Sequence, residues 1–277
     1  MISIKKLIIS CLAFLTVFGV GFSTVLAEST TTTNNFSISP LNPDTGAPQS
    51  SYYNLNLKPT EKKSIQVRIF NSSNEDIEVN VALNNATTND NGVISYAGEG
   101  NKDSSLKIPF TSVAKIDKNK IKIPKQGSYD ATINIDMPKQ EYQGIVLGGI
   151  RVTKAENSSK NEDNKVAVKA NVAYSVAVVL TEKTGLINPN IQLLSVNKES
   201  KNYRNVISAQ LQNSAPRLIK KLMADAKVYK KDSRKVLYEA KKSEMQMAPN
   251  SNFNFGINLE NTPFKSGEYT MVVSGDA

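Results

Sequence analysis

Residues 64–83 read SIQVRIFNSSNEDIEVNVAL, and their pattern sets the fold class. Ile65, Val67 and Ile69 alternate with polar residues, and the same alternation returns over residues 77–83. A period of two residues is typical of an extended strand that has one face on an apolar core and the other in water. We therefore predict two such strands here.

Related patterns continue through the first half of the chain. Residues 133–137 alternate, whereas 144–152 and 166–180 are more continuously apolar, as in strands that are covered on both faces. The stretch 154–165 between the last two segments is polar and predicts an exposed loop. We interpret these two segments and their loop as a hairpin.

The second half repeats the pattern after residues 184–190, where a Gly and a Pro predict a linker. We therefore expect a first domain at 36–183 and a second at 191–277. A helix is an alternative only within residues 220–240, but apolar side chains alternate there and Lys231-Asp232-Ser233 suits a hairpin turn. Six strands are predicted in the second domain, at residues 191–196, 203–211, 222–229, 235–240, 253–259 and 269–273.

Many short strands without a helical period predict an all-β fold, and we expect two tandem immunoglobulin-like β-sandwich domains. The chain has no Trp, so the Cys and Trp core of antibody domains is absent. A constant-type sandwich usually has seven strands, whereas six are counted in the second domain. We therefore expect the second domain to be C-terminally incomplete in this sequence.

The N-terminus predicts export. Lys5 and Lys6 precede an apolar run over residues 7–26, and Val25-Leu26-Ala27 is a small-residue cleavage pattern, so residues 1–27 are interpreted as a signal peptide. The alternative is a retained membrane anchor, since the run approaches the length of a spanning helix. Cleavage would remove Cys11, the only cysteine, so that the secreted chain has no disulfide. The polar residues 28–35 are expected to form a flexible lead.

The charge balance favours anionic partners. The chain has 34 basic and 25 acidic residues and a net charge of +9. Outside a cell such partners include wall teichoic acids, anionic lipid head groups, glycosaminoglycans and acidic host proteins. Nucleic acid is not expected as a partner because the chain is exported. The structural alternative is a well-solvated surface, since basic and acidic residues are interspersed.

The sequence offers no complete catalytic or metal-binding set. It has no histidine, which removes Ser-His-Asp and Cys-His nucleophiles and histidine-based metal sites. The motif Ser-x-x-Lys occurs at Ser112 and Ser195, and Lys-Thr-Gly begins at Lys183. That chemistry needs the serine at the start of a helix, whereas both serines lie in segments with strand character. We therefore expect no enzyme, no catalytic residue, no metal and no cofactor.

Acidic pairs and an Asn-rich turn are better explained by structure. Asp130 with Asp136, or Glu260 with Glu268, could serve a wall glycosidase, but the chain has no Trp to stack on sugar rings. Asn89-Asp90-Asn91-Gly92 resembles the start of a calcium loop without its acidic twelfth ligand. It is interpreted as a tight hairpin turn.

Several motifs of the first half resemble the first domain of the WxL-interacting protein family. These are Phe36-Ser37-Ile38-Ser39-Pro40 with Pro43, Leu57-Lys58-Pro59, Ala86 to Tyr96, Asp103 with Ser105-Leu106, Ile123-Pro124, Met137-Pro138 and Gly144-Ile145-Val146-Leu147-Gly148-Gly149-Ile150. Motifs of the second half are similar to the second domain of that family, namely Leu211-Gln212-Asn213 with Pro216, Met247-Ala248-Pro249-Asn250-Ser251 with Phe253, and Pro263-Phe264-Lys265-Ser266-Gly267-Glu268-Tyr269.

The resemblance implies a location on the surface of Gram-positive bacteria and an adhesin-like function. It implies peptidoglycan binding by the first domain, and binding of host or extracellular-matrix proteins by the second. It also implies partnership with proteins that carry a WxL domain. Members usually continue into a final strand, a membrane-spanning helix and a basic tail. This sequence ends at Ala277 without an apolar segment of spanning length, so the expected anchor is missing.

Two groups of residues are candidates for contact. Polar and aromatic residues in exposed turns are the peptidoglycan candidates, namely Asn89, Asp90, Asn91 and Tyr96. Basic residues clustered after Pro216 are the partner-binding candidates, namely Arg217, Lys220 and Lys221. A structural role is the alternative for the first group.

Two other functions compete with wall binding. An assembly or chaperone-like protein would take up WxL partners by adding a strand from the partner to one of its sheet edges. A wall hydrolase is the third alternative.

Overall fold

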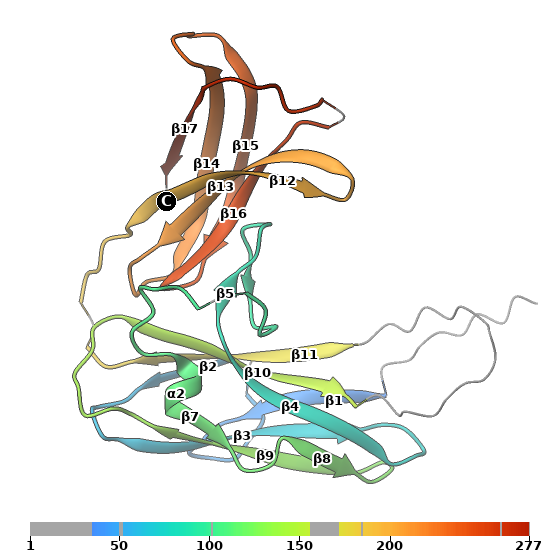
Figure 1. Ribbon diagram of the computed structural model, residues 1–277. Helices are drawn as coiled ribbons and strands as arrows, with labels where there is room; N and C mark the ends of the chain where they lie inside the picture. Colours follow the sequence, from blue (N-terminus) through green and yellow to red (C-terminus); the bar gives the residue numbers. More distant parts are fainter. Residues whose placement is uncertain are drawn as a thin grey trace, which may run out of the picture. The chain divides into compact units, whose positions relative to one another are not determined.

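The computed structural model describes residues 35–49, 52–100, 102–155, 172–183, 185–260 and 262–276, which form two β-sandwiches (Figure 1). The expected signal peptide lies outside the described residues, as do most of the polar lead and of the loop expected at 154–165. Within the described ranges, no helix has the length and hydropathy needed to cross a membrane.

The first sandwich consists of a four-stranded and a five-stranded sheet. The four-stranded sheet contains, in spatial order, β1 (Phe36–Leu41), β3 (Lys62–Asn71), β9 (Ser128–Asp136) and β7 (Ala114–Ile116). The five-stranded sheet contains β2 (Tyr52–Asn56), β11 (Ala173–Thr181), β10 (Ile145–Lys154), β4 (Ile77–Asn85) and β8 (Lys120–Ile123). All neighbours are antiparallel except β2 and β11, which are parallel.

The alternation predicted in β3 and β4 is confirmed by burial. Ile65, Val67 and Ile69 are each 0% exposed and belong to one core with Val79 and Val81 of the opposite sheet. Apolar area removed from water at these positions stabilises the fold by about 25 cal/mol per Å². The core therefore lies between the two sheets, where the two-residue period places it.

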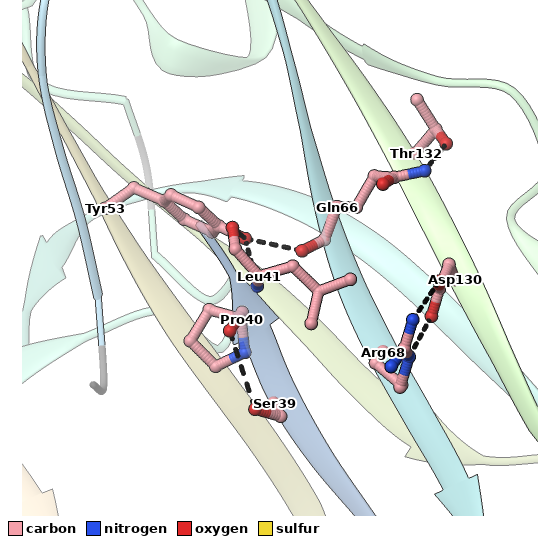
Figure 2. A network of polar contacts seen from close by, with 8 residues as sticks. All are labelled: Ser39, Pro40, Leu41, Tyr53, Gln66, Arg68, Asp130 and Thr132. Carbon is pink, nitrogen blue, oxygen red and sulfur yellow. Dashed lines mark hydrogen bonds and ion pairs between the residues drawn. The ribbon is translucent and has the colours of Figure 1, made fainter. Parts of the chain in front are cut away.

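Tyr53 of β2 links the two sheets by hydrogen bonds to β1 and β3 (Figure 2). Its hydroxyl donates to the carbonyl of Gln66 at 2.5 Å and lies 3.0 Å from both the amide and the carbonyl of Leu41. Burial raises the pKa of Tyr53 to about 12, against the effect of these hydrogen bonds. On the outer face of β3, Arg68 forms a bidentate ion pair with Asp130 of β9 at 2.6 and 2.7 Å. Asp130 is therefore a structural partner of Arg68.

A four-residue helix, α2 (Phe110–Val113), corrects the expectation of a strand at Ser112. Phe110 is 0% exposed and packs on Gly148 of β10, where an added Cβ would stand 2.1 Å from the ring. The helix is too short to show a helical period in the sequence. Ser112 donates its hydroxyl to the carbonyl of Pro109, whereas Ser195 does lie in a strand.

The second sandwich contains six described strands, in the places where the sequence predicts them. One sheet has the order β12 (Ile191–Lys201), β13 (Arg204–Asn213), β16 (Ser251–Asn258), and the other β15 (Val236–Met247), β14 (Ile219–Lys230), β17 (Tyr269–Asp276). Asp232 adopts φ 61° in the turn between β14 and β15, which confirms the hairpin expected at Lys231-Asp232-Ser233. The core of the second sandwich includes Leu211, Leu222 and Phe255.

Candidate functional site

The short hairpin of β5 (Thr87–Thr88) and β6 (Ile94–Ser95) is built by its own turn residues. The Asn89 side-chain oxygen accepts from the backbone amides of Asn91 and Val93 at 3.0 and 3.1 Å. Gly92 donates its backbone amide to the Asn89 carbonyl at 2.8 Å and adopts φ 70°. Asn89 and Gly92 therefore close the tight turn that the sequence predicts.

The tip of this hairpin contacts the second sandwich. The Gly92 carbonyl accepts from the amide of Gln246 at 2.7 Å, and the Asn91 carbonyl accepts from the Lys242 ammonium at 2.7 Å. Asp90 forms an ion pair with Lys201 and accepts from the backbone amide of Asn254 at 3.0 Å. Asn91 and Asp90, two of the candidates for wall contact, therefore also join the two sandwiches.

Tyr96, the aromatic candidate, is half-buried between the sandwiches. Its ring covers Gly149 of β10, where an added Cβ would stand 2.6 Å from the tyrosine Cβ. It packs on a small apolar cluster formed by Ala86 and Leu147 of the first sandwich and Ala248 of the second. Burial raises the pKa of Tyr96. The ring is therefore held by packing on both sandwiches.

Asp103 is the centre of the polar contacts between the sandwiches. Only 5% of the residue is exposed. Its carboxylate accepts from the amide side chains of Gln212 at 2.8 Å and Asn252 at 2.5 Å, and from the backbone and hydroxyl of Ser105 at 2.8 and 2.6 Å. Burial alone raises the pKa of the Asp103 carboxyl, but these hydrogen bonds outweigh it and hold that pKa below its usual value.

A second set of buried polar contacts lies beside Asp103. The hydroxyls of Thr88 and Ser251 are 2.6 Å apart, and the Thr88 oxygen accepts from the amide of Ala248 at 3.0 Å. The Asn250 side chain donates to the Ser105 hydroxyl at 3.2 Å and to the Ser214 carbonyl at 2.9 Å. Because these polar groups are paired, their burial is not costly.

A polar cleft of about 880 Å³, called the amide-rich cleft below, opens next to these contacts. Seven of its lining residues carry side-chain amides: Asn84, Asn85, Asn89, Gln210, Asn250, Asn252 and Asn254. An amide group both donates and accepts hydrogen bonds, which suits hydroxyl and acetamido groups of a saccharide. The Asn85 oxygen accepts from the amide of Thr111 at 3.1 Å, while its NH₂ group has no acceptor among the described residues.

Of the candidate residues, Asn89 and Asp90 line this cleft, whereas Asn91 and Tyr96 do not. Phe253 is the aromatic residue in the lining and is 3% exposed, so hydrogen bonding rather than ring stacking would recognise a ligand here. Sequence reasoning gave no role to Asp103 or to the amides of Asn85 and Asn254. The sequence feature that pointed to this cleft was the high proportion of Asn between residues 84 and 91.

The basic candidates of the second sandwich have separate environments. Arg217 donates to the carbonyl of Ile187 at 2.5 Å, and so holds the segment that precedes β12. Lys220 and Lys221 are exposed at an irregularity in the pairing of β14 with β15, where Lys221 adopts φ 58°. The two lysines therefore remain candidates for an acidic partner, while Arg217 also has a structural role.

Exposed apolar side chains gather on the second sandwich. A pocket of about 230 Å³ is lined by Val196 of β12, by Tyr269 of β17 and by Phe264. These three side chains are 44%, 41% and 36% exposed, respectively. Since strand β12 pairs with β13 on one side only, in the part of the chain that the structure describes, it presents a free edge beside the pocket.

Two models of one protein family match successive parts of the chain. Residues 36–154 match the family model for the WxL Interacting Protein peptidoglycan binding domain, and residues 163–276 match that for its host binding domain. Both matched models describe binding domains. A search of curated proteins by sequence gave no match.

Solved structures resemble the chain only weakly. The CupB2 chaperone of Pseudomonas aeruginosa is 10% identical over 81% of this chain and 97% of that one, with a TM-score of 0.32. The CsuC-CsuE chaperone and tip adhesion subunit complex of Acinetobacter baumannii is 11% identical over 79% of this chain and 89% of that one, with a TM-score of 0.36. Because these TM-scores are low, the partners of those proteins are not inferred for this chain.

Proposed function

Because the chain belongs to the WxL-interacting protein family, we propose that it is a non-enzymatic binding protein of the Gram-positive cell surface. In this proposal the first sandwich binds peptidoglycan, and the second binds host or extracellular-matrix proteins and WxL-domain partners. The match of residues 36–154 to a peptidoglycan binding domain supports a location at the wall.

The observation that carries the proposal is the amide-rich cleft. Peptidoglycan is a polymer of acetamido sugars with short peptides, and its groups are mainly hydroxyls and amides. Asn85 of the first sandwich and Asn254 of the second both face this cleft as lining residues. Hydrogen-bonding groups that converge in a concave site fix a ligand's orientation and give specificity.

Cosedimentation with purified insoluble peptidoglycan tests this proposal. The full chain should sediment with the polymer in a saturable way and should release no soluble fragments from it. Asn85→Ala should weaken binding, because it removes an amide NH₂ that has no acceptor within the described chain. Asn80→Ala is the matched control, since Asn80 is an exposed residue of the same strand outside the cleft.

Three results would count against this proposal. Equal retention of the Asn85→Ala and Asn80→Ala variants on peptidoglycan would show that the cleft is not the binding site. Failure of the unmodified chain to sediment with the polymer would show that the protein does not bind peptidoglycan. Release of soluble wall fragments would favour a hydrolase.

Uptake of a WxL partner by strand addition is the second candidate function. It is favoured by the free edge of β12, where Leu193 and Val196 are 42% and 44% exposed. Backbone pairing along such an edge would give affinity, and the apolar pocket would accept a partner's side chain.

Complex formation with a purified WxL-domain protein tests the second function. Val196→Lys should abolish a one-to-one complex on size-exclusion chromatography, because a charge on an edge strand opposes pairing. Val93→Lys is the control, since Val93 is 52% exposed and lies on the β5–β6 turn. An unaltered complex with Val196→Lys would exclude this edge as the site of uptake.

A further inference from the structure

A basic groove of about 770 Å³ crosses the first sandwich where β3 begins and β9 ends. Its charged lining residues are Lys62, Lys63, Lys107, Lys115, Lys139 and Asp136. The lysines come from two strands and two connecting segments, so that the fold brings five ammonium groups and one carboxylate to a single surface.

Only two of these five lysines have a carboxylate partner in the part of the chain that the structure describes. Lys62 pairs with Asp136 at 3.2 Å, and Lys63 pairs with Asp44 at 2.7 Å. The lysines at 107, 115 and 139 are exposed, and none has an ion-pair partner among the described residues. Three ammonium groups of the groove therefore have no ion pair within the described ranges, although the carboxylate of Asp117 lies nearby and accepts from Asn134 of the groove.

The lysines of β8, on the other sheet of the same sandwich, show a different arrangement. Lys120 pairs with Glu78 at 2.8 Å and Lys122 pairs with Asp76 at 3.2 Å. Both acids lie on the neighbouring strand β4 or just before it. The groove therefore differs from β8, where both lysines have a carboxylate partner.

We propose that the basic groove binds a phosphodiester-linked polyol polymer of the bacterial wall. Such a polymer carries one negative charge at each repeat, and several separated ammonium groups match it better than they match a single carboxylate. Electrostatic contacts of this kind are strengthened when bound counterions are released. The location at the wall rests on the proposed function, whereas the ligand goes beyond it.

Neutral groups in the groove fit the same ligand. Gln140 lines it with an amide, and Ser112 lines it with a hydroxyl whose oxygen accepts no hydrogen bond among the described residues, whereas the Asn134 amide is already bonded to Ser64 and Asp117. The side chains of Gln140 and Ser112 can bind the hydroxyls of the polyol between phosphates. The basic groove shares no lining residue with the amide-rich cleft, so the two sites can be tested separately.

The test measures binding of a purified glycerol-phosphate polymer to the full chain at low salt. The triple variant Lys107→Gln, Lys115→Gln and Lys139→Gln should bind about tenfold more weakly or worse, and should show a shallower dependence of affinity on salt. A control triple variant, Lys118→Gln, Lys120→Gln and Lys122→Gln, removes the same charge from the same sandwich and should bind almost as the unmodified chain does.

Two further binding measurements distinguish this proposal from peptidoglycan binding in the amide-rich cleft and from unspecific binding of polyanions. Peptidoglycan stripped of phosphodiester polymers should be bound equally by the groove variant and the unmodified chain, and more weakly by Asn85→Ala. Polyglutamate of similar length should bind more weakly than the glycerol-phosphate polymer. Equal losses in the two triple variants, no binding of the polymer by the unmodified chain, or equal affinity for polyglutamate would each overturn the proposal.

Discussion

Gln212 of the second sandwich donates its side-chain amide to the carboxylate of Asp103 of the first, with 2.8 Å between nitrogen and oxygen. The two residues are 109 positions apart in the sequence, and both are buried. Asn252 donates to the second oxygen of the same carboxylate. A single acidic side chain therefore joins two strands of the second sandwich to the first.

Removal of this carboxylate is expected to weaken the contact between the sandwiches. Asp103→Ala leaves the buried amide donor of Gln212 and the half-buried amide donor of Asn252 without their acceptor. The free energy of unfolding should fall by about 2 kcal/mol, the usual cost of leaving buried polar groups unpaired. Denaturant unfolding measures this loss. Asp117→Ala, at an exposed residue that accepts from Asn134, is the control and should cost much less.

The same carboxylate should make stability depend on acid. The pKa of Asp103 is held below its usual value in the folded chain, so its contribution is present above the unfolded pKa of about 3.9 and is lost as the pH falls through the folded pKa. Asp103→Asn has no such titration. The difference in melting temperature between the unmodified chain and Asp103→Asn should shrink as the pH falls from neutral to below the unfolded pKa of about 3.9 and on through the lower folded pKa. A difference that stays constant would show that Asp103 does not titrate as described.

Packing at Gly148 predicts a large effect from a small substitution. A methyl group at this position would stand 2.1 Å from the buried ring of Phe110, so α2 would have to move. Gly148→Ala should lower the free energy of unfolding by about 1 to 3 kcal/mol, as is usual for overpacked cores. Gly46→Asn is the control, because no atom lies within 4 Å of that site and Asn tolerates its φ of 70°. Similar stability of both variants would contradict the packing assigned to Gly148.

The exposed lysines of β14 predict a salt effect on partner binding. Lys220 and Lys221 carry no ion pair within the described ranges. If they steer an acidic host protein, retention of the chain on an immobilised extracellular-matrix preparation should fall as the Debye length decreases from about 10 Å at 0.1 M salt to about 3 Å at 1 M. Lys220→Gln with Lys221→Gln should flatten this dependence. Lys230→Gln at the other end of β14, combined with Lys235→Gln in the connection to β15, should not. A flat response of the unmodified chain would indicate an apolar contact.

Strands β3, β4 and β9 of the first sandwich were predictable because burial of one face leaves a two-residue period in the sequence, and β10 and β11 because their segments are apolar. Strands β1, β2, β7 and β8 were not predicted. Glycines within a strand, such as Gly148 and Gly149, allow bulky groups to approach closely, so contacts of this kind are compatible with the sequence. The identity of those groups, Phe110 and Tyr96, was not predictable. Helix α2 left no signal because four residues are too few for a helical period.

The contacts that shape the amide-rich cleft could not be predicted for a different reason. Asp103 meets Asn252 across 149 positions, and Thr88 meets Ser251 across 163. No local pattern links residues so far apart. Sequence reasoning therefore identified the hairpin at Asn89 as exposed, and missed that its tip contacts the second sandwich.

Binding of peptidoglycan in the amide-rich cleft can be measured by titrating the isotope-labelled full chain with soluble peptidoglycan fragments and following the side-chain amides by NMR. The side-chain signals of Asn85 and Asn254 should show saturable shifts, and that of Asn80 should show none. Absence of any shift at Asn85 and Asn254, while signals elsewhere on the first sandwich move, would contradict binding in this cleft.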